Sequence, residues 1–204
     1  MRVAAIVLAA GSSTRFGKPK QFALFQGETF IRRIVAAAIE AGCAPVVVVA
    51  AEDSAQITSE LTQFTVTIAM NPDWQRGLGS SIVVGIRHVM NLAPDVDAVV
   101  LLTCDQPFVT VAVLAQLIQL RLTSGKPIIA SAYAETLGIP ALFDRSCFSD
   151  LLRLEGDSGA KKIILARPHD VVSFDFPAGA IDIDTAADYN KLYQPLAADG
   201  TRLG

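Results

Sequence analysis

The sequence has 204 residues, of which 51% are hydrophobic, and it carries a formal net charge of -3. This length suffices for one substantial core and favours a single domain. The slightly acidic balance does not indicate a nucleic-acid-binding surface. The first apolar run is short and leads into a glycine loop instead of a signal-peptide cleavage site, and no apolar run approaches the length of a membrane span. We therefore expect neither a nucleic-acid partner nor a membrane partner.

The cysteines and histidines exclude several kinds of site. Cys43, Cys104 and Cys147 are far apart and form neither a CxxC pair nor a disulfide framework, so we expect buried, reduced thiols and a cytoplasmic location. With only His88 and His169, a multi-histidine metal site is excluded. No G-x-S-x-G elbow accompanies either histidine, which argues against a Ser-His-Asp triad.

Apolar runs alternate with helical patterns from the start of the chain to about residue 122. The predicted strands are 3–10, 45–51, 65–70 and 97–105, and the predicted helices are 28–42, 53–63, 79–91 and 110–122. Continuous Val, Ile and Leu runs are typical of strands buried on both faces, and with intervening helices they predict a parallel sheet of βαβ units. We expect an α/β fold with a single Rossmann-like, doubly wound, mostly parallel sheet and helices on both faces.

After the apolar segment 127–133 the pattern is less regular. We interpret the remaining segments as short strands and helices that cover one end of the sheet. Residues 1–193 are expected to form one domain, and the weakly patterned residues 194–204 a mobile tail.

In open parallel sheets, ligands bind outside the carboxyl ends of the strands. The first candidate loop, 10–21, combines small residues with cations and therefore predicts a phosphate-binding loop; an ordinary solvated turn is the alternative. It is not a P-loop, because five residues separate Gly11 from Gly17 and Pro19 stands where a Ser or Thr should follow Lys18.

Three further loops lie at the same predicted edge: 71–81, 104–109 and 184–188. Asp105 comes directly after a buried strand, where a carboxylate could hold Mg²⁺ or cap the next turn. We place Asp182 and Asp184 at alternate positions of a strand, pointing the same way, although Asp184 or Thr185 could equally begin a helix.

Motifs in all four loops resemble those of a known family. They are "VLAAGSSTRFGKPKQ" (7–21), "NPDWQRGLGSSI" (71–82), "CDQP" (104–107), "GIP" (138–140), "GDSGAKK" (156–162) and "DIDTAAD" (182–188). In order and spacing they resemble the molybdenum cofactor cytidylyltransferases, a branch of the MobA-like NTP transferases, over about residues 3 to 190. The resemblance implies a nucleotidyltransferase domain of the nucleotide-diphospho-sugar transferase type, which joins CTP to a molybdopterin-type acceptor with Mg²⁺.

The resemblance also implies roles for individual residues. Nucleotide-binding roles fall on Ala9, Ala10, Gly11, Ser12, Ser13, Arg15, Lys20, Asn71, Gly77, Ser80 and Ser81. Arg15, Lys20 and Asp105 would be catalytic, Asp105 would hold the metal with Asp184 or Asp182, and Gly156, Asp157 and Gly159 would lie near the acceptor. Lys18 occupies a variable position of the signature and is expected to be secondary.

Ala10 favours CTP, because "LAAG" is the form of the cytidylyl branch whereas guanylyl enzymes have "LAGG". The family often has proline where Ala186 stands here, which weakens a helix-start signal. Two alternatives share the chemistry: guanylyl transfer to molybdopterin, and cytidylyl transfer to a sugar or polyol phosphate. A third, of another class, is a non-catalytic nucleotide-binding protein that delivers cofactor to a client molybdoenzyme.

Overall fold

The computed structural model describes residues 1–11, 19–51, 55–183 and 185–192. Several predicted site residues lie outside these ranges, namely Ser12, Ser13, Arg15 and Asp184, as do Lys18 and the predicted tail at 194–204. Within the described ranges, no helix is both long and apolar enough to cross a membrane.

A seven-stranded sheet forms the centre of the molecule, in the order β5-β4-β1-β6-β8-β7-β9. Its strands are β1 (Val3–Leu8), β4 (Val46–Ala50), β5 (Thr67–Met70), β6 (Ala98–Thr103), β7 (Ile128–Tyr133), β8 (Thr136–Asp144) and β9 (Val171–Asp175). Neighbouring strands from β5 to β6 pair in parallel, as do β7 and β9. Only β8 is reversed in this sheet, antiparallel to both β6 and β7. The predicted doubly wound, mostly parallel α/β fold is confirmed.

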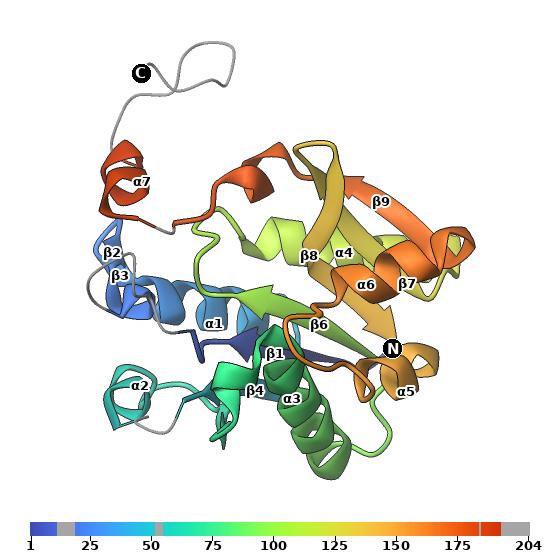
Figure 1. The fold of residues 1–204 in the computed structure, drawn as a ribbon, viewed down its shortest axis with the longest axis horizontal. Coiled ribbons are helices and arrows are strands. Elements are labelled where there is room, and N and C mark those ends of the chain that lie inside the picture. Colours follow the sequence, from blue (N-terminus) through green and yellow to red (C-terminus); the bar gives the residue numbers. More distant parts are fainter. Residues whose placement is uncertain (12–18, 52–54, 184, 193–204) are drawn as a thin grey trace.

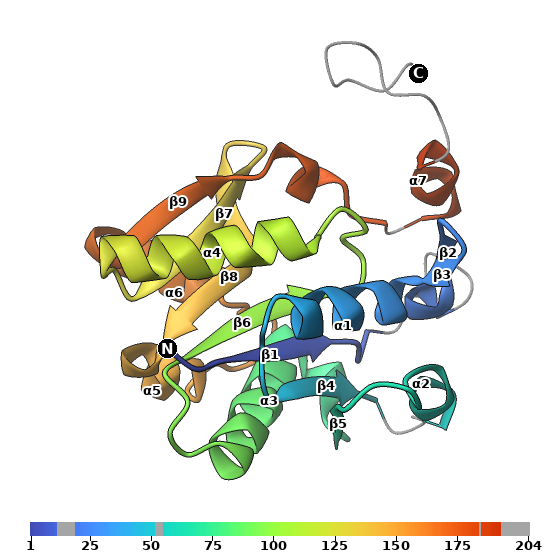
Figure 2. The same cartoon turned by 180° about the vertical axis from the view of Figure 1, so that it is seen from behind.

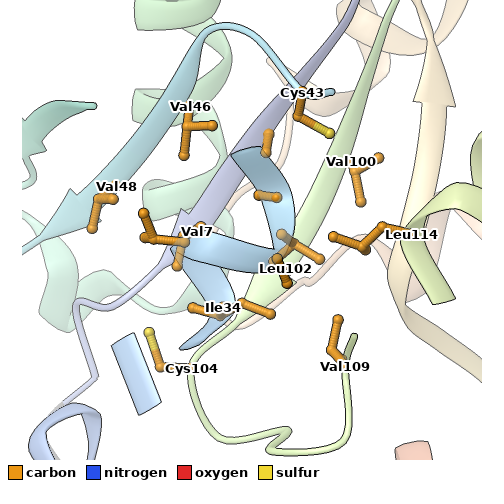
Figure 3. Close-up of a cluster of buried hydrophobic side chains, with 14 of the residues drawn as sticks. Val7, Ile34, Cys43, Val46, Val48, Val100, Leu102, Cys104, Val109 and Leu114 are labelled. Atoms are coloured by element: carbon orange, nitrogen blue, oxygen red, sulfur yellow. The ribbon is translucent and has the colours of Figure 1, made fainter. Parts of the chain in front are cut away.

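Helices cover both faces of the sheet, as the two opposite views show (Figures 1 and 2). One face carries α1 (Phe30–Glu40) and α4 (Val111–Ser124), and the other carries α3 (Leu78–Leu92), α5 (Phe148–Leu151) and α6 (Lys161–Ala166). On the first face, Ile34 of α1 and Leu114 of α4 pack with Val100 and Leu102 of β6 (Figure 3). The central strands β1 and β4 are buried throughout, because helices cover each of their faces.

The cysteines behave as predicted from their spacing. All three are free and buried. Cys43 and Cys104 belong to the core cluster under α1 and α4, and Cys147 belongs to the cluster on the opposite face. They therefore contribute apolar packing, as free cysteines commonly do.

Two expectations for the second half of the chain are wrong. The segments after residue 133 do not simply cover one end of the sheet: β8 and β9 belong to the sheet itself. Residues 181–183 form no strand, so the expectation that Asp182 lies on one is wrong, whereas Asp184 lies outside the described residues. A 3₁₀ turn at Pro177–Ala180 redirects the chain, and the Ile183 amide then donates to the Asp105 carbonyl oxygen at 3.1 Å. The segment thus crosses the end of the sheet instead of pairing along it.

Short elements complete the edge of the domain: β2 (Leu24–Phe25), β3 (Glu28–Thr29), α2 (Ala55–Glu60) and α7 (Ala186–Lys191). Thr185 begins α7 with a capping box, in which its hydroxyl accepts from the Asp188 amide and the Asp188 carboxylate accepts from the Thr185 amide. This box supplies the start signal that a proline at position 186 would otherwise strengthen. The Tyr189 hydroxyl then donates to the Leu24 carbonyl oxygen at 2.7 Å, which fastens α7 to the β2–β3 hairpin.

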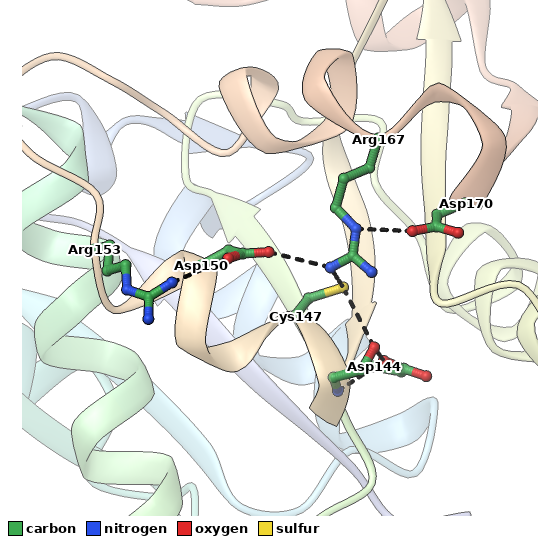
Figure 4. Close-up of polar contacts among 7 residues, drawn as sticks. Asp144, Cys147, Asp150, Arg153, Arg167 and Asp170 are labelled. Carbon is green, nitrogen blue, oxygen red and sulfur yellow. Dashed lines mark hydrogen bonds and ion pairs between the residues drawn. The ribbon is translucent and has the colours of Figure 1, made fainter.

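A polar cluster fixes α6 to its surroundings (Figure 4). Arg167, just after α6, donates to Asp170 at 2.8 Å, to Asp150 of α5 at 3.1 Å and to the Cys147 sulfur at 3.4 Å. Charge-assisted hydrogen bonds thus link the end of α6 to α5, the two helices that the connection 152–160 joins. This connection carries the GDSG motif that borders the candidate site.

Candidate active site

A cavity of about 360 Å³ opens at the carboxyl ends of β1 and β6. It is lined by Leu8, Ala9, Ala10, Gly11, Lys20, Gln21, Trp74, Gln75, Gly77, Leu78, Ser81, Thr103, Cys104, Asp105 and Asp157. Ala9 and Ala10 are buried where the chain leaves β1, and the Ala9 amide still bonds to the Val49 carbonyl oxygen at 2.8 Å. This cavity, called the nucleotide cavity below, collects residues from three of the four predicted loops.

Lys20 and Asp105 meet in the nucleotide cavity. Lys20 begins a 3₁₀ turn, Asp105 lies two residues past β6, and the Lys20 Nζ atom donates to Asp105 Oδ2 at 2.6 Å. Their side chains are 18% and 21% exposed, so the pair is partly shielded from water and from salt. The structure thus places two residues predicted to be catalytic in direct contact, although 85 positions separate them.

Asn71 organises the loop that leads into α3. Its side chain is buried, and its Nδ2 donates to the hydroxyls of Ser80 at 2.9 Å and Ser81 at 3.0 Å. Its Oδ1 accepts from the Asp73 amide at 3.1 Å. Of these residues only Ser81 lines the nucleotide cavity; Asn71 and Ser80 line a separate cavity of about 230 Å³ behind the loop.

The GDSG motif packs directly on this loop. Gly77 has φ 103° and ψ 177°, and a Cβ there would lie 2.6 Å from the Gly156 carbonyl oxygen. The Gly79 amide donates to that same oxygen at 3.1 Å. Asp157 consequently reaches the nucleotide cavity, whereas Gly159 lines a third cavity beside it. The three residues predicted near the acceptor are thus divided between different cavities, with Gly156 in the one behind the loop.

The third cavity, about 320 Å³, shares Leu78, Thr103 and Asp105 with the nucleotide cavity. We call it the acceptor-side cavity. Its other lining residues are Gln106, Tyr133, Thr136, Leu137, Gly138, Ile139, Gly159, Ala160, Lys161 and Asp182. Asp105 therefore borders both cavities.

Asp105 and Asp182 act on the same neighbour in the acceptor-side cavity. The pKa of Tyr133 is raised, first by burial and next by the charge of Asp182; a hydrogen bond with Gln106 opposes the rise and the charge of Asp105 adds to it. Both carboxylates line the acceptor-side cavity, and the hydrogen bond from the Ile183 amide to the Asp105 carbonyl oxygen joins the two segments that carry them.

This pair of carboxylates fits a hard divalent cation. Mg²⁺ is commonly bound by one or two carboxylates, while substrate phosphates and water complete its coordination. Among the described residues, no group of three or more His, Cys, Asp and Glu side chains could hold a metal alone. Asp105 and Asp182 therefore suit a metal that arrives with a phosphate ligand better than a permanently bound structural metal.

Two residues of this edge do not follow from sequence patterns alone. Gln106 is 5% exposed, and its Nε2 donates to the carbonyl oxygens of Ile139 at 2.9 Å and Gly179 at 3.1 Å. The Tyr133 hydroxyl donates to the same Ile139 oxygen at 2.8 Å. Gln106 lies inside the "CDQP" motif, so the motif marks its position, but its partners are 33 and 73 residues away and only the fold brings them near.

Cys104 lines the nucleotide cavity but is not suited to act as a nucleophile. Burial raises the pKa of its thiol well above the ordinary value, the charge of Asp105 raises it further, and Lys20 offsets only part of the rise. The thiol is therefore protonated at neutral pH, whereas the thiolate is the nucleophilic form of cysteine.

Comparison with known proteins places this site in a family. A family model described as the MobA-like NTP transferase domain matches residues 5–171. The nicotine blue oxidoreductase of Paenarthrobacter nicotinovorans is 25% identical over 205 residues, which cover 93% of this chain and 96% of that protein. The probable molybdenum cofactor guanylyltransferase of Bacillus mycoides (strain KBAB4) is 32% identical over 109 residues, which cover 53% of this chain and 52% of that protein.

A solved structure agrees over nearly the whole chain. The crystal structure of Rv0371c from Mycobacterium tuberculosis H37Rv, in complex with manganese, is similar with a TM-score of 0.76 at 27% identity. The likeness covers 94% of this chain and 98% of that one. From the extent of the family match, the chain belongs to the MobA-like NTP transferase domain family, a family of nucleotidyltransferases.

Proposed function

We propose that this protein transfers the CMP group of CTP to the phosphate of a molybdopterin-type acceptor and releases pyrophosphate. One observation carries the proposal: Asp105 contacts Lys20 at 2.6 Å and borders two adjoining cavities. A nucleotidyl transfer needs such an arrangement, because a nucleotide and an acceptor must meet at one phosphorus atom with charged groups around it.

The nucleotide would occupy the cavity above β1. Backbone groups of Ala9, Ala10 and Gly11 line it, and the small side chains allow a phosphate to approach the chain closely. Gly77 and Ser81 also line this cavity, and they are proposed to face the base and ribose. Asn71 and Ser80 would support this part of the lining through their hydrogen bonds to the loop. The signature residues Ser12, Ser13 and Arg15 are proposed to complete the phosphate loop.

The chemistry needs positioned charge more than a reactive side chain. An oxygen of the acceptor phosphate attacks the α-phosphorus of CTP, the bond from that phosphorus to the β-phosphate oxygen breaks, and pyrophosphate leaves with the electron pair. The acceptor phosphate is already anionic at neutral pH, so no general base is required. Lys20 and Arg15 would stabilise the charge on the leaving pyrophosphate.

Asp105 is proposed to hold Mg²⁺, with Asp182 or Asp184 as the second carboxylate. When bound, this cation supplies positive charge to phosphate oxygens and helps to orient the two substrates. Asp105 is suited to this role because it borders both cavities. In the structure its charge is balanced by Lys20, which would exchange the carboxylate for a phosphate when the nucleotide enters.

CTP is preferred in this proposal because of Ala10. This residue is buried and lines the nucleotide cavity, so its methyl group occupies space that the glycine of "LAGG" sequences leaves open. A cavity narrowed in this way favours the smaller pyrimidine base of CTP over the purine base of GTP. The likeness to a probable molybdenum cofactor guanylyltransferase supports the acceptor class and keeps guanylyl transfer as the second candidate.

Several broader assignments belong to the same proposal. Residues 1–193 would act as one nucleotidyltransferase domain, and the product would pass to a client molybdoenzyme. A cytoplasmic location is supported by three free, buried cysteines, since disulfides are rare in that compartment. Cytidylyl transfer to a sugar or polyol phosphate remains an alternative. The intact pair of Lys20 and Asp105 argues against a non-catalytic delivery protein.

Pyrophosphate release tests the proposal. Purified protein would be assayed with molybdopterin and Mg²⁺, with CTP or GTP, and as Lys20→Ala beside the matched control Lys18→Ala. We expect turnover with CTP, a loss of about 10²–10³-fold in kcat for Lys20→Ala, and near wild-type rates for Lys18→Ala. Preference for GTP would overturn the choice of nucleotide, and no turnover with any nucleotide would overturn the transferase. Wild-type kcat in Lys20→Ala would overturn the role given to this residue.

A further inference from the structure

The acceptor-side cavity has an unusual balance of charge. Two carboxylates, Asp105 and Asp182, lie in its lining, and Lys161 is the single cation among the described lining residues. Lys20 balances Asp105 from the nucleotide cavity but does not line the acceptor-side cavity. Before a metal is bound, a phosphate that enters from the acceptor side therefore meets two negative charges and one positive charge.

Lys161 is placed by a rigid local structure. It is the first residue of α6 and follows Ala160, which is 1% exposed and packs in the core beneath the helix. Upstream, the Gly79 amide holds the Gly156 carbonyl oxygen; downstream, Arg167 holds Asp150 and Asp170. Both ends of this segment are fixed, so the Lys161 backbone is positioned at the cavity while its side chain can extend.

The neighbouring lysine provides a contrast. Lys162 lines a different cavity, of about 270 Å³, together with Asp150, Arg153 and Arg167. Within the described residues neither lysine forms an ion pair or a side-chain hydrogen bond. Lys161 and Lys162 thus have the same charge, helix and exposure class, but only Lys161 lines the cavity that contains Asp105.

Electrostatics favours one role for Lys161. A phosphate monoester carries between one and two negative charges at neutral pH, and like charges beside it oppose its entry. Lysine is a compact point charge on a flexible stem, suited to reach a phosphate that shifts position during a reaction. A cation on the acceptor side would offset the repulsion from Asp105 and Asp182 before the phosphate reaches the nucleotide.

We propose that Lys161 binds the phosphate of the acceptor and thereby selects phosphorylated acceptors at this cavity. The inference rests on the proposed nucleotidyl transfer and adds the residue that recognises the attacking phosphate. It also predicts a division of labour between two lysines: Lys20 acts on the nucleotide phosphates and Lys161 on the acceptor phosphate.

The test compares Lys161→Ala, Lys161→Arg and the matched control Lys162→Ala by steady-state pyrophosphate release, with molybdopterin and CTP varied separately. We expect Lys161→Ala to raise the KM for molybdopterin about tenfold, as for loss of one charge-assisted hydrogen bond at an exposed site. The KM for CTP should stay within about twofold of the wild-type value, because Lys161 does not line the nucleotide cavity. Lys161→Arg should retain most of the acceptor affinity, and Lys162→Ala all of it.

The outcomes separate the two proposals. An active wild-type enzyme whose acceptor KM is unchanged by Lys161→Ala overturns the role of Lys161 and leaves the proposed function standing. An equal rise in Lys161→Ala and Lys162→Ala also overturns it, because the effect would then be general surface charge. A wild-type protein that releases no pyrophosphate overturns the proposed function, and the role of Lys161 falls with it. Circular dichroism and urea unfolding of each variant would establish that all remain folded.

Discussion

The two sides of the active-site edge are built in different ways. On the nucleotide side, the ends of the parallel strands β1 and β6 and the segments that follow β1, β5 and β6 supply the lining residues, apart from Asp157 of the GDSG motif. On the acceptor side, the cavity combines the β7–β8 hairpin, the start of α6 and the crossing segment at Asp182. The nucleotide side follows a general rule for parallel sheets, whereas the acceptor side depends on one reversed strand and on contacts between distant segments.

Residues after β6 and in the loop before α3 connect the two sides. Asp105 and Gln106 follow β6, and both line the acceptor-side cavity, while Gly77 presses against the GDSG motif from the nucleotide side. Mutations at these junctions test whether the two sides work as a unit.

Asp105 should matter most, because it borders both cavities. We expect Asp105→Asn to lower kcat for pyrophosphate release by about 10²–10³-fold, as for loss of a preorganised charge in other enzymes. Asp182 lines only the acceptor-side cavity of the two. We therefore expect Asp182→Asn to lower kcat less than Asp105→Asn does. Titration with Mg²⁺ checks the reason: both variants should need more metal for half-maximal activity. A larger loss in Asp182→Asn would reverse the proposed ranking of the two carboxylates.

Gly77→Ala should disrupt the contact between the two sides. The added Cβ would lie 2.6 Å from the Gly156 carbonyl oxygen, and φ of 103° with ψ of 177° disfavours any side chain. Overpacking and backbone strain together should lower the free energy of unfolding by about 2–4 kcal/mol. Urea unfolding measures this change.

A matched control separates strain from collision. Gly125 also has a positive φ, 67°, but a Cβ there would have no neighbour within 4 Å. Gly125→Ala should therefore cost only about 1 kcal/mol. If Gly77→Ala destabilises the protein no more than Gly125→Ala, the packing of the GDSG motif on this loop is weaker than the structure indicates.

Gln106→Leu should weaken the acceptor side while sparing the nucleotide side. The buried Gly179 carbonyl oxygen would lose its donor, whereas the Ile139 oxygen keeps the Tyr133 hydroxyl. An unsatisfied buried acceptor costs about 1–3 kcal/mol, which urea unfolding would measure. The KM for the acceptor should rise with little change in the KM for CTP. Gln116→Leu, at an exposed position of α4, is the control, and an equal loss of stability there would contradict the role of Gln106.

The smallest expected effect is a difference in alkaline stability that arises from two buried cysteines, Cys43 and Cys147, on opposite faces of the sheet. Burial raises the pKa of Cys43 from 9.0 to about 11, so the unfolded chain loses this proton at lower pH than the folded protein does. The contribution of this thiol to the free energy of unfolding is therefore fully present below pH 9 and is lost as the pH rises towards 11. Between pH 8 and pH 10, the free energy of unfolding should fall by about 1 kcal/mol more in the wild type than in Cys43→Ala.

Cys147 is the buried cysteine on the opposite face of the sheet and can be compared with Cys43. Burial raises its pKa too, but Arg167 and a hydrogen bond from Ser146 oppose the rise. We therefore expect Cys147→Ala to reduce the loss of unfolding free energy between pH 8 and pH 10 by less than Cys43→Ala does. Urea unfolding at both pH values measures the two differences, and an equal effect of both variants would contradict this reasoning.

The sequence by itself determined the parallel part of the sheet and pointed to a candidate site at its edge. Buried strands such as β1 and β6 are continuous apolar runs, and ligand-binding loops at their carboxyl ends follow from chain direction alone. The sequence shows Lys20 and Asp105 only as members of two separate motifs. It does not show that they pair, because hydrophobic periodicity carries no information about which loops meet.

Tertiary structure decided the acceptor side. The reversed β8, the place of β7 and β9 in the sheet and the irregular path through Asp182 depend on pairing between segments that are far apart in the chain. The distinction between Lys161 and Lys162 has the same origin. Adjacent residues at a helix start have equal local propensities, and only the packing of α6 against the end of the sheet determines which one lines the cavity with Asp105. Local patterns specify elements, whereas their contacts depend on the whole core.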